Sequence, residues 1–338
     1  MAFVEIKSLS KKFQDKQVLD KISFSIDKGE FMGLVGPNGA GKTTLINLMM
    51  GLLPADEGEV LLDGCPMAHN DLALKQRIAY VPQELALYKD SSCWENLIYF
   101  ATLYNLFGQE RKQKAEKALE VVGLTAERNT KVKKLSGGMA RRLNLACAIM
   151  HEPEFLILDE PTVGIDAQSR NFIFEYLEAI NAQGVTILYT SHYMEEIEKL
   201  CDRVFIIDKG QEVACGTQDQ IRGLVADTRK IDFVFASPLS QEKLASLSAF
   251  PGVKELTVDA EKKGEAKSEL VGEKLAQAAQ AADAKTADHL QVEIIAAAFS
   301  LNDFLQALEQ DTEILSIDYR RVSLEEVFLA LTGRELRA

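Results

Sequence analysis

The sequence predicts an α/β fold with an open sheet, followed by a small α+β domain. Residues 31–35 and 155–158 carry the first part of this prediction, because they are short, bounded apolar runs typical of fully buried strands. A glycine-rich loop and a helical pattern follow the first run, up to residue 50; this strand–loop–helix order is a unit of an α/β sheet. Beyond residue 224, shorter strand and helix patterns alternate.

Length and composition bound the kind of protein. The 338 residues predict two domains, or one large domain with an appendage. A net charge of −13 argues against general nucleic-acid binding, which needs a basic face. The 5 cysteines are scattered without a C-x-x-C pair, which favours reduced thiols in a cytoplasmic protein over disulfides or a zinc site. Because neither a signal peptide nor a membrane-spanning run is evident, we expect any membrane association to depend on a partner.

The chain begins with two predicted strands, residues 3–9 and 17–27, joined by a polar turn. Phe13 lies just before that turn. An aromatic ring there can stack on a nucleotide base, although packing is the simpler explanation of Phe13 taken alone.

The next stretch matches the phosphate-binding pattern G-x-x-x-x-G-K-[ST]. Its residues are Gly36, Pro37, Asn38, Gly39, Ala40, Gly41, Lys42, Thr43 and Thr44. Glycines let backbone N–H groups turn toward a phosphate, and the helix N-terminus adds its positive end. Lys42 is expected to reach the terminal phosphates and the Thr43 hydroxyl to be a Mg²⁺ ligand. The stretch therefore predicts binding of a nucleoside triphosphate.

Between this loop and residue 134 the pattern changes from strands to helices. Residues 59–64 read as a strand and turn, and 77–83 as a strand ended by proline and followed by Gln83. Alone, that glutamine reads as a solvated loop residue. Residues 92–122 are amphipathic and helical, and they interrupt the strand–helix alternation, so we interpret them as part of an inserted subdomain.

A second cluster of small residues opens the helix that runs to residue 149. Ser136 is a suitable N-cap, and Gly137 and Gly138 expose backbone N–H groups at the helix start. This is a second potential phosphate site, although a Ser-Gly-Gly cap by itself is common.

Paired carboxylates follow the apolar run at 155–158. Asp159 and Glu160 lie where a central strand ends, which is where ligands bind in open α/β sheets. Asp159 is placed to hold Mg²⁺, directly or through water, and Glu160 to polarise an attacking water. A further buried strand, 185–190, delivers His192 to the same edge, where we expect a γ-phosphate contact. Residues 204–214 are predicted to form a β-hairpin.

In this order the motifs resemble the nucleotide-binding subunit of an ABC transporter, over residues 3–226. The resemblance implies an ABC-type P-loop NTPase with a RecA-like core, an antiparallel β subdomain and a helical subdomain at about 90–150. It also implies two cassettes that pack head to tail, bury ATP between them and act on separate integral membrane permease subunits. The chain is then expected to be peripheral on the inner face of the plasma membrane.

The resemblance also assigns roles to single residues. It makes Phe13 the adenine-stacking aromatic, Gln83 a Mg²⁺ contact that senses the membrane subunit, and Ser136 with its two glycines the signature that caps the γ-phosphate of the opposite subunit. Asp159 matches the magnesium carboxylate, Glu160 the catalytic base and His192 the switch histidine, while Asp166 falls in the loop at the dimer interface. Met139 departs from the family's frequent glutamine, which we expect to tune activity rather than abolish it.

The tail sharpens the subfamily. Residues 227–338 are predicted to form a small α+β accessory domain of ferredoxin-like type, with an exposed insertion at 261–288, poor in large apolar residues. The ending, Val322 to Arg334, resembles ATPases of the multidrug and antibiotic-resistance export branch. We expect an ATP hydrolase that energises export. Two alternatives stay open: an ATP-driven conformational switch of a membrane complex that does not transport, and a soluble ABC ATPase outside transport.

Overall fold

The computed structural model describes residues 2–67, 71–225, 228–237, 239–259, 288–295, 298–308 and 313–333. The chain divides into two compact units: residues 1–221 with 328–338, and residues 222–327. The predicted insertion at 261–288 falls almost entirely outside the described residues, as does the predicted boundary at 226/227. Among the described residues, no helix is both long and apolar enough to cross a membrane.

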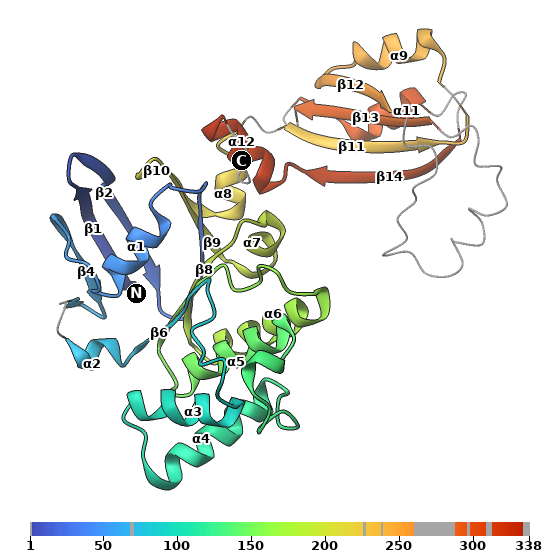
Figure 1. The fold of residues 1–338 in the computed structure, drawn as a ribbon. Helices are drawn as coiled ribbons and strands as arrows, with labels where there is room; N and C mark the ends of the chain where they lie inside the picture. Colours follow the sequence, from blue (N-terminus) through green and yellow to red (C-terminus); the bar gives the residue numbers. More distant parts are fainter. Residues whose placement is uncertain are drawn as a thin grey trace. The chain divides into compact units, whose positions relative to one another are not determined.

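A six-stranded sheet forms the centre of the first unit (Figure 1). Its strands, in spatial order, are β10 (Gln211–Thr217), β9 (Arg203–Asp208), β3 (Phe31–Val35), β8 (Thr186–Thr190), β7 (Phe155–Asp159) and β6 (Ile78–Val81). All neighbours pair in parallel except β9 and β10, which form the predicted hairpin. Every residue of β3, β7 and β8 is buried, as expected for a parallel sheet covered on both faces.

A four-stranded antiparallel sheet packs on this centre. Its order is β2 (Lys16–Asp27), β1 (Ala2–Phe13), β4 (Glu57–Leu62) and β5 (Cys65–Pro66). Leu19 and the alternating residues Ile22, Phe24 and Ile26 of β2 join the buried cluster of the parallel sheet. The first strand is longer than the predicted 3–9, because pairing with β2 continues to Phe13.

Three helices form the helical block of the first unit (Figure 1). They are α3 (Cys93–Leu103), α4 (Gly108–Val121) and α5 (Gly137–Ile149), which share one buried core. A capping box starts α3, since the Ser92 hydroxyl accepts from the Glu95 N–H and the Glu95 carboxylate accepts from the Ser92 N–H. The block covers nearly the same residues as the helical subdomain predicted from the sequence.

The other α-helices of this unit range from 4 to 15 residues in length. They are α1 (Lys42–Met49), α2 (Leu72–Lys75), α6 (Ala167–Asn181), α7 (Met194–Leu200) and α8 (Gln218–Arg222). Of these, α1 follows the phosphate loop as predicted. Helix α12 (Leu324–Thr332) lies where the division between the two units falls.

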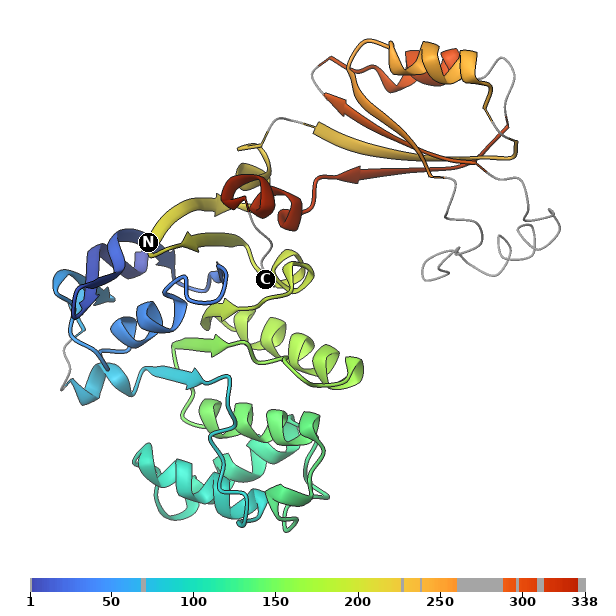
Figure 2. The same ribbon diagram turned by 45° about the horizontal axis from the view of Figure 1, so that its top comes forward.

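The second unit is a four-stranded antiparallel sheet with helices on one face, as Figure 2 shows. Its elements run β11 (Thr228–Phe235), α9 (Gln241–Ser248), β12 (Val253–Asp259), β13 (Asp288–Ile295), α11 (Leu301–Leu308) and β14 (Ile314–Arg321). The spatial order is β12-β13-β11-β14, and the described elements follow one another as β-α-β-β-α-β, the connectivity of a ferredoxin-like module. Its core is apolar and includes Phe233, Phe235 and Phe304.

Candidate active site

The loop at 36–44 joins β3 to α1, and its glycines have steric reasons to be there. A side-chain carbon on Gly36 would come within 2.3 Å of the Ile207 carbonyl oxygen, so the loop can follow β9 this closely only without one. Gly41 has a φ of 109° and is the N-cap of α1, a backbone conformation that other residues rarely adopt. These constraints turn the loop around the N-terminus of α1, where backbone N–H groups can bind phosphate.

Lys42 lies inside this loop and is buried. Its ammonium group donates to the carbonyl oxygens of Gly36 at 2.6 Å and Pro37 at 3.3 Å. Burial lowers the pKa of Lys42, while the charges of Glu160 and Asp159 act in the opposite direction and raise it. Lys42 of the phosphate loop therefore lies within the electrostatic influence of both carboxylates.

The two carboxylates lie at the C-terminal end of β7, beside the end of the neighbouring strand β8. Asp159 pairs with Thr190 in the register of β7 and β8, and its Oδ1 accepts from the Thr190 hydroxyl at 2.8 Å. Tyr80 approaches the other oxygen at 3.4 Å. Burial, followed by the charge of Asp159, raises the pKa of Tyr80 to about 12, so that phenol stays neutral.

Glu160 is held in an unusual backbone conformation. Its φ is 49°, in the left-handed region, and its N–H donates to the hydroxyl of Thr190 at 2.9 Å. Such a conformation persists where surrounding contacts fix it and is frequent at active sites. Glu160 is buried at 5% exposure, and its two oxygens contact different partners: Nε2 of Gln83 at 2.7 Å and Nε2 of His192 at 2.5 Å. The structure thus brings together three residues that lie far apart in the sequence.

The segment after β6 is fixed by residues that the sequence analysis did not identify. Arg141 of α5 donates to the carbonyl oxygens of Pro82 at 3.2 Å and Gln83 at 2.7 Å. The Asn144 side chain accepts from the Ala86 N–H at 3.1 Å, one turn further along the same helix. An arginine and an asparagine on an otherwise apolar helix face were the available signal, because buried polar side chains need partners.

The predicted signature starts α5, away from the phosphate loop of the same chain. Ser136 is exposed and caps the helix, accepting from the Met139 N–H at 3.2 Å. Gly138 lies so close to the N-terminus of α6 that a side-chain carbon there would be 2.0 Å from the Ser169 hydroxyl. Asp166 caps α6 by accepting from the Ser169 N–H at 2.8 Å, which lowers the pKa of Asp166. The signature and the loop of Asp166 therefore form one exposed surface.

Phe13 lies at the end of β1, beside the β1–β2 turn. Its ring is 45% exposed, and the Lys11 ammonium lies 5.7 Å from the ring centre. An exposed ring of this kind is available to stack on a base, and the structure does not bury it in the core.

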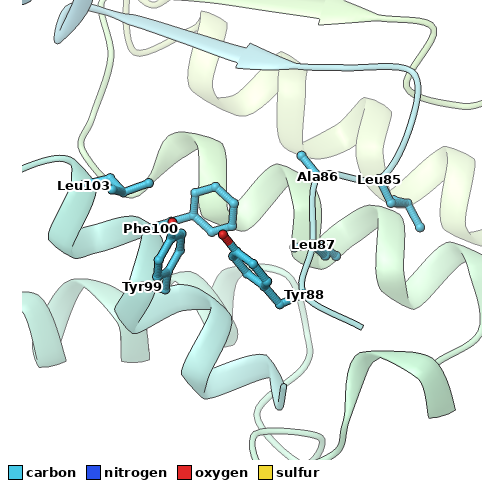
Figure 3. A pocket seen from close by; sticks show the side chains of 7 residues that line it. All are labelled: Leu85, Ala86, Leu87, Tyr88, Tyr99, Phe100 and Leu103. Atoms are coloured by element: carbon cyan, nitrogen blue, oxygen red, sulfur yellow. The ribbon is translucent and has the colours of Figure 1, made fainter. Parts of the chain in front are cut away.

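A second surface feature is an apolar groove on the helical block (Figure 3). It is lined by Leu85, Ala86, Leu87, Tyr88, Tyr99, Phe100 and Leu103. The Tyr88 and Tyr99 rings meet edge to face with centres 4.8 Å apart, and both are about half exposed, at 51% and 43%. A cluster of exposed aromatic and aliphatic side chains is typical of a protein-binding surface.

The candidate Mg²⁺ ligands are a hydroxyl, a carboxylate and an amide: Thr43, Asp159 and Gln83. Within the described ranges, no group of three or more His, Cys, Asp or Glu side chains could hold a metal ion. Thr43 is exposed beside the buried Lys42. Oxygen donors with a single carboxylate fit Mg²⁺, which keeps several waters and binds nucleotide phosphates.

Together the fold and the site define a P-loop nucleoside triphosphatase. Residues 19–163 match the ABC transporter family. The linearmycin resistance ATP-binding protein LnrL of Bacillus subtilis (strain 168) is 39% identical over 335 residues, covering 99% of both chains. A Nod factor export ATP-binding protein I of Paraburkholderia xenovorans (strain LB400) is 32% identical over 337 residues, with the same coverage of each.

Solved structures agree with these sequence relatives. An ATP-binding subunit of an ABC transporter superposes with a TM-score of 0.61 at 30% identity, covering 66% of this chain and 92% of that one. CbiO1 of Clostridium perfringens, part of the ABC transporter complex cbiONQ, gives 0.61 at 26% identity, covering 66% and 91%. The chain belongs to the ABC transporter ATP-binding proteins: it binds ATP and hydrolyses it, and subunits of this family work with membrane permeases.

Proposed function

We propose that the chain energises export through separate membrane permease subunits, and that it lies against the inner face of the membrane by binding them. The main support for the hydrolytic mechanism is that Glu160 contacts Gln83 and His192 beside the phosphate loop. The direction of transport is inferred from full-length similarity to proteins named for resistance and export.

In this proposal the side chains have the following roles. Lys42 and the loop N–H groups bind the β- and γ-phosphates, and Phe13 stacks on the adenine. Glu160 accepts a proton from the attacking water, and His192 donates a hydrogen bond to the γ-phosphate. Mg²⁺, held by Thr43, Asp159 and Gln83, supplies positive charge to the phosphate oxygens when it is bound. Asp159 is kept in place by the Thr190 hydroxyl.

We further propose that the working unit contains two cassettes. Helix α5 stands with the helical block, whereas α1 lies beside the β1–β2–β4 sheet (Figure 1). The exposed surface of Ser136, Gly137 and Asp166, with the buried Gly138 beneath it, can complete the ATP site of a second cassette. That cassette is either a copy of this chain or a paired one. In this arrangement Ser136 and the two glycine N–H groups bind the γ-phosphate of the opposite subunit.

The apolar groove on the helical block is the proposed docking surface for the permease. Its lining segment, residues 85–88, begins two residues after Gln83. A membrane subunit that inserts a helix there would contact the same segment that reaches Glu160. Binding at the groove and hydrolysis at the sheet edge are therefore connected through six residues of chain, 83–88.

Efflux in cells that co-express the chain with its membrane subunits tests this function. We expect Glu160→Gln to abolish ATP-dependent efflux while the protein still binds ATP. Wild-type efflux by that variant would contradict the assignment of Glu160. ATP hydrolysis by the wild type without any ATP-dependent movement of substrate would favour the conformational switch over the transporter.

A further inference from the structure

Behind the catalytic edge lies another buried glutamate, Glu196. It is in the first turn of α7 and is 3% exposed. Three hydroxyl groups donate to one of its oxygens, Oε2: Ser191 at 2.6 Å, Thr162 at 2.9 Å and Tyr189 at 2.9 Å. Hydrogen bonds to an ionised carboxylate are about twice as strong as neutral ones, so this cluster fixes the rotamers of its donors.

Two of the three donors belong to the loops that carry the catalytic groups. Thr162 lies two residues after Glu160, in the loop that follows β7. Ser191 immediately precedes His192, in the loop that follows β8. The Ser191 hydroxyl also accepts from the N–H of Tyr193 at 3.0 Å, so it contacts the backbone on the far side of His192. One carboxylate oxygen thus connects the two loops.

This arrangement lowers the stability of the folded state. Across the described residues, the second oxygen of Glu196, Oε1, is buried and has no hydrogen-bond partner. Burial and then the charge of Glu196 raise the pKa of Tyr189 well above its ordinary value. A buried carboxylate that is only half satisfied usually costs stability relative to an apolar side chain. Its presence here therefore needs a reason other than stability.

We find the reason for Glu196 in the geometry of the neighbouring pair, Glu160 and His192. Glu160 has the strained φ of 49°, and its Oε1 lies 2.5 Å from Nε2 of His192. A strained residue stays in place only when its surroundings fix it. Thr190 holds the N–H of Glu160 from one side, and Thr162, held by Glu196, fixes the chain just beyond it.

We propose that Glu196 is a positioning residue for ATP hydrolysis, which locks the loops after β7 and β8 so that Glu160 and His192 keep their contact. This inference rests on the proposed roles of those two residues. Glu196 does not touch the nucleotide in this account; it acts through Thr162 and Ser191. Positioning by such a supporting shell is a general requirement for catalytic groups.

Steady-state ATP hydrolysis by the full-length chain tests the inference. Glu196→Gln keeps the volume but replaces one charged acceptor with an amide, so we expect kcat to fall about tenfold while KM for ATP changes less than about twofold. Thr162→Val and Ser191→Ala each remove one donor to the same oxygen and should lower kcat in the same direction. Glu195→Gln, an exposed neighbour on the same helix, is the matched control and should behave as wild type.

A double-mutant cycle separates positioning from a general loss of stability. If Thr162 acts through Glu196, Thr162→Val should reduce kcat much less in the Glu196→Gln background than in the wild type. Full additivity, or a wild-type kcat for Glu196→Gln, would overturn the inference. Should Glu196→Gln fail to fold, the two single donor variants decide the matter, and wild-type kcat in both would overturn it.

Glu160→Gln, assayed alongside, distinguishes this inference from the proposed function. If Glu160→Gln is inactive but Glu196→Gln hydrolyses ATP at the wild-type rate, only the positioning role of Glu196 is disproved. A Glu160→Gln variant that hydrolyses ATP at the wild-type rate removes the proposed catalytic role itself, and the inference falls with it.

Discussion

The catalytic edge of the parallel sheet and the apolar groove of the helical block are built in opposite ways. At the edge, polar side chains are buried and fixed: Asp159 and Glu160 are 6% and 5% exposed and hydrogen-bonded. In the groove, Tyr88 and Tyr99 are about half exposed, and their rings meet edge to face. The first construction suits chemistry, which needs fixed charges, and the second suits binding of another protein, which needs accessible apolar surface.

The segment after β6 joins these two regions. Gln83 at its start reaches Glu160, and Tyr88 at its end lines the groove. Arg141, Asn144 and Asn96 hold it along its length: Asn96 accepts from the Tyr88 N–H at 2.8 Å. If a partner binds at the groove as proposed, it can influence hydrolysis by shifting this one short, well-anchored segment. Changes to either end, or to the anchor, should separate the two functions.

The largest effect on ATP turnover is expected from a substitution of Glu160, at the catalytic edge of the sheet. Glu160→Gln removes the proposed base but keeps the shape, and we expect ATP turnover to fall at least about a hundredfold. ATP binding should persist because Lys42 and the loop are unchanged. Phosphate release and nucleotide binding, measured on the same preparation, check this. A parallel loss of binding and turnover would indicate damage to the fold instead.

A substitution in the apolar groove should weaken binding of the partner without affecting the catalytic edge. Tyr99→Asp puts a charge on the apolar surface, and we expect binding to the permease to weaken about tenfold or more, with unchanged basal ATP hydrolysis. Leu72→Asp, at an exposed leucine outside the groove, is the control. Co-purification with the membrane subunits measures the effect. Equal binding by both variants would show that the partner docks elsewhere.

A smaller effect is expected from a substitution of Arg141, which anchors the segment after β6. Arg141→Gln removes the donor to the carbonyl oxygens of Pro82 and Gln83, and we expect kcat to fall about fivefold because Gln83 is less well placed. Arg142→Gln is the control, since Arg142 donates to Val122 and lies over the Phe172 ring instead. Identical kinetics of the two variants would show that the Arg141 contacts do not position Gln83 for hydrolysis.

The smallest effect at neutral pH is expected at His151, which supports the helical block. Its ring stacks on Tyr104 with centres 3.7 Å apart, and burial lowers the pKa of His151 from 6.5 to about 4. The unfolded chain therefore binds a proton that the folded chain does not, so this contribution to stability is full above pH 6.5 and is lost as the pH falls toward 4.

His151→Phe keeps an aromatic ring but cannot titrate. Between pH 7 and pH 5 the free energy of unfolding of the wild type should fall by about 2 kcal/mol more than that of the variant. Denaturant unfolding at the two pH values measures the difference. Parallel losses would mean that His151 is not the titrating group.

Much of the catalytic edge could be predicted because its residues are set by local patterns. The phosphate loop is a continuous motif, and Asp159 and Glu160 directly follow an apolar strand. Parallel strands end at one edge, so the sequence also indicated that His192 belongs there. The ferredoxin-like order of the second unit follows from its alternating strands and helices.

The contacts across the chain could not be predicted in the same way. Arg141 and Glu196 lie within helical patterns, and nothing local shows that one reaches the carbonyl oxygen of Gln83 and the other collects three hydroxyl groups. The left-handed conformation of Glu160 is likewise a result of packing. The groove combines residues 85–88 with one face of α3, so it exists only once the helical block has folded.

In the proposed working unit, the exposed signature surface of one cassette completes the ATP site of another. Light scattering on Glu160→Gln with ATP tests this pairing, because blocked hydrolysis should trap the closed pair. We expect the mass of two chains with ATP and of one chain without it. Lys42→Ala, which loses the phosphate contact, should stay at one chain under both conditions. A Glu160→Gln variant that binds ATP yet keeps the mass of one chain would contradict pairing between two copies of this chain.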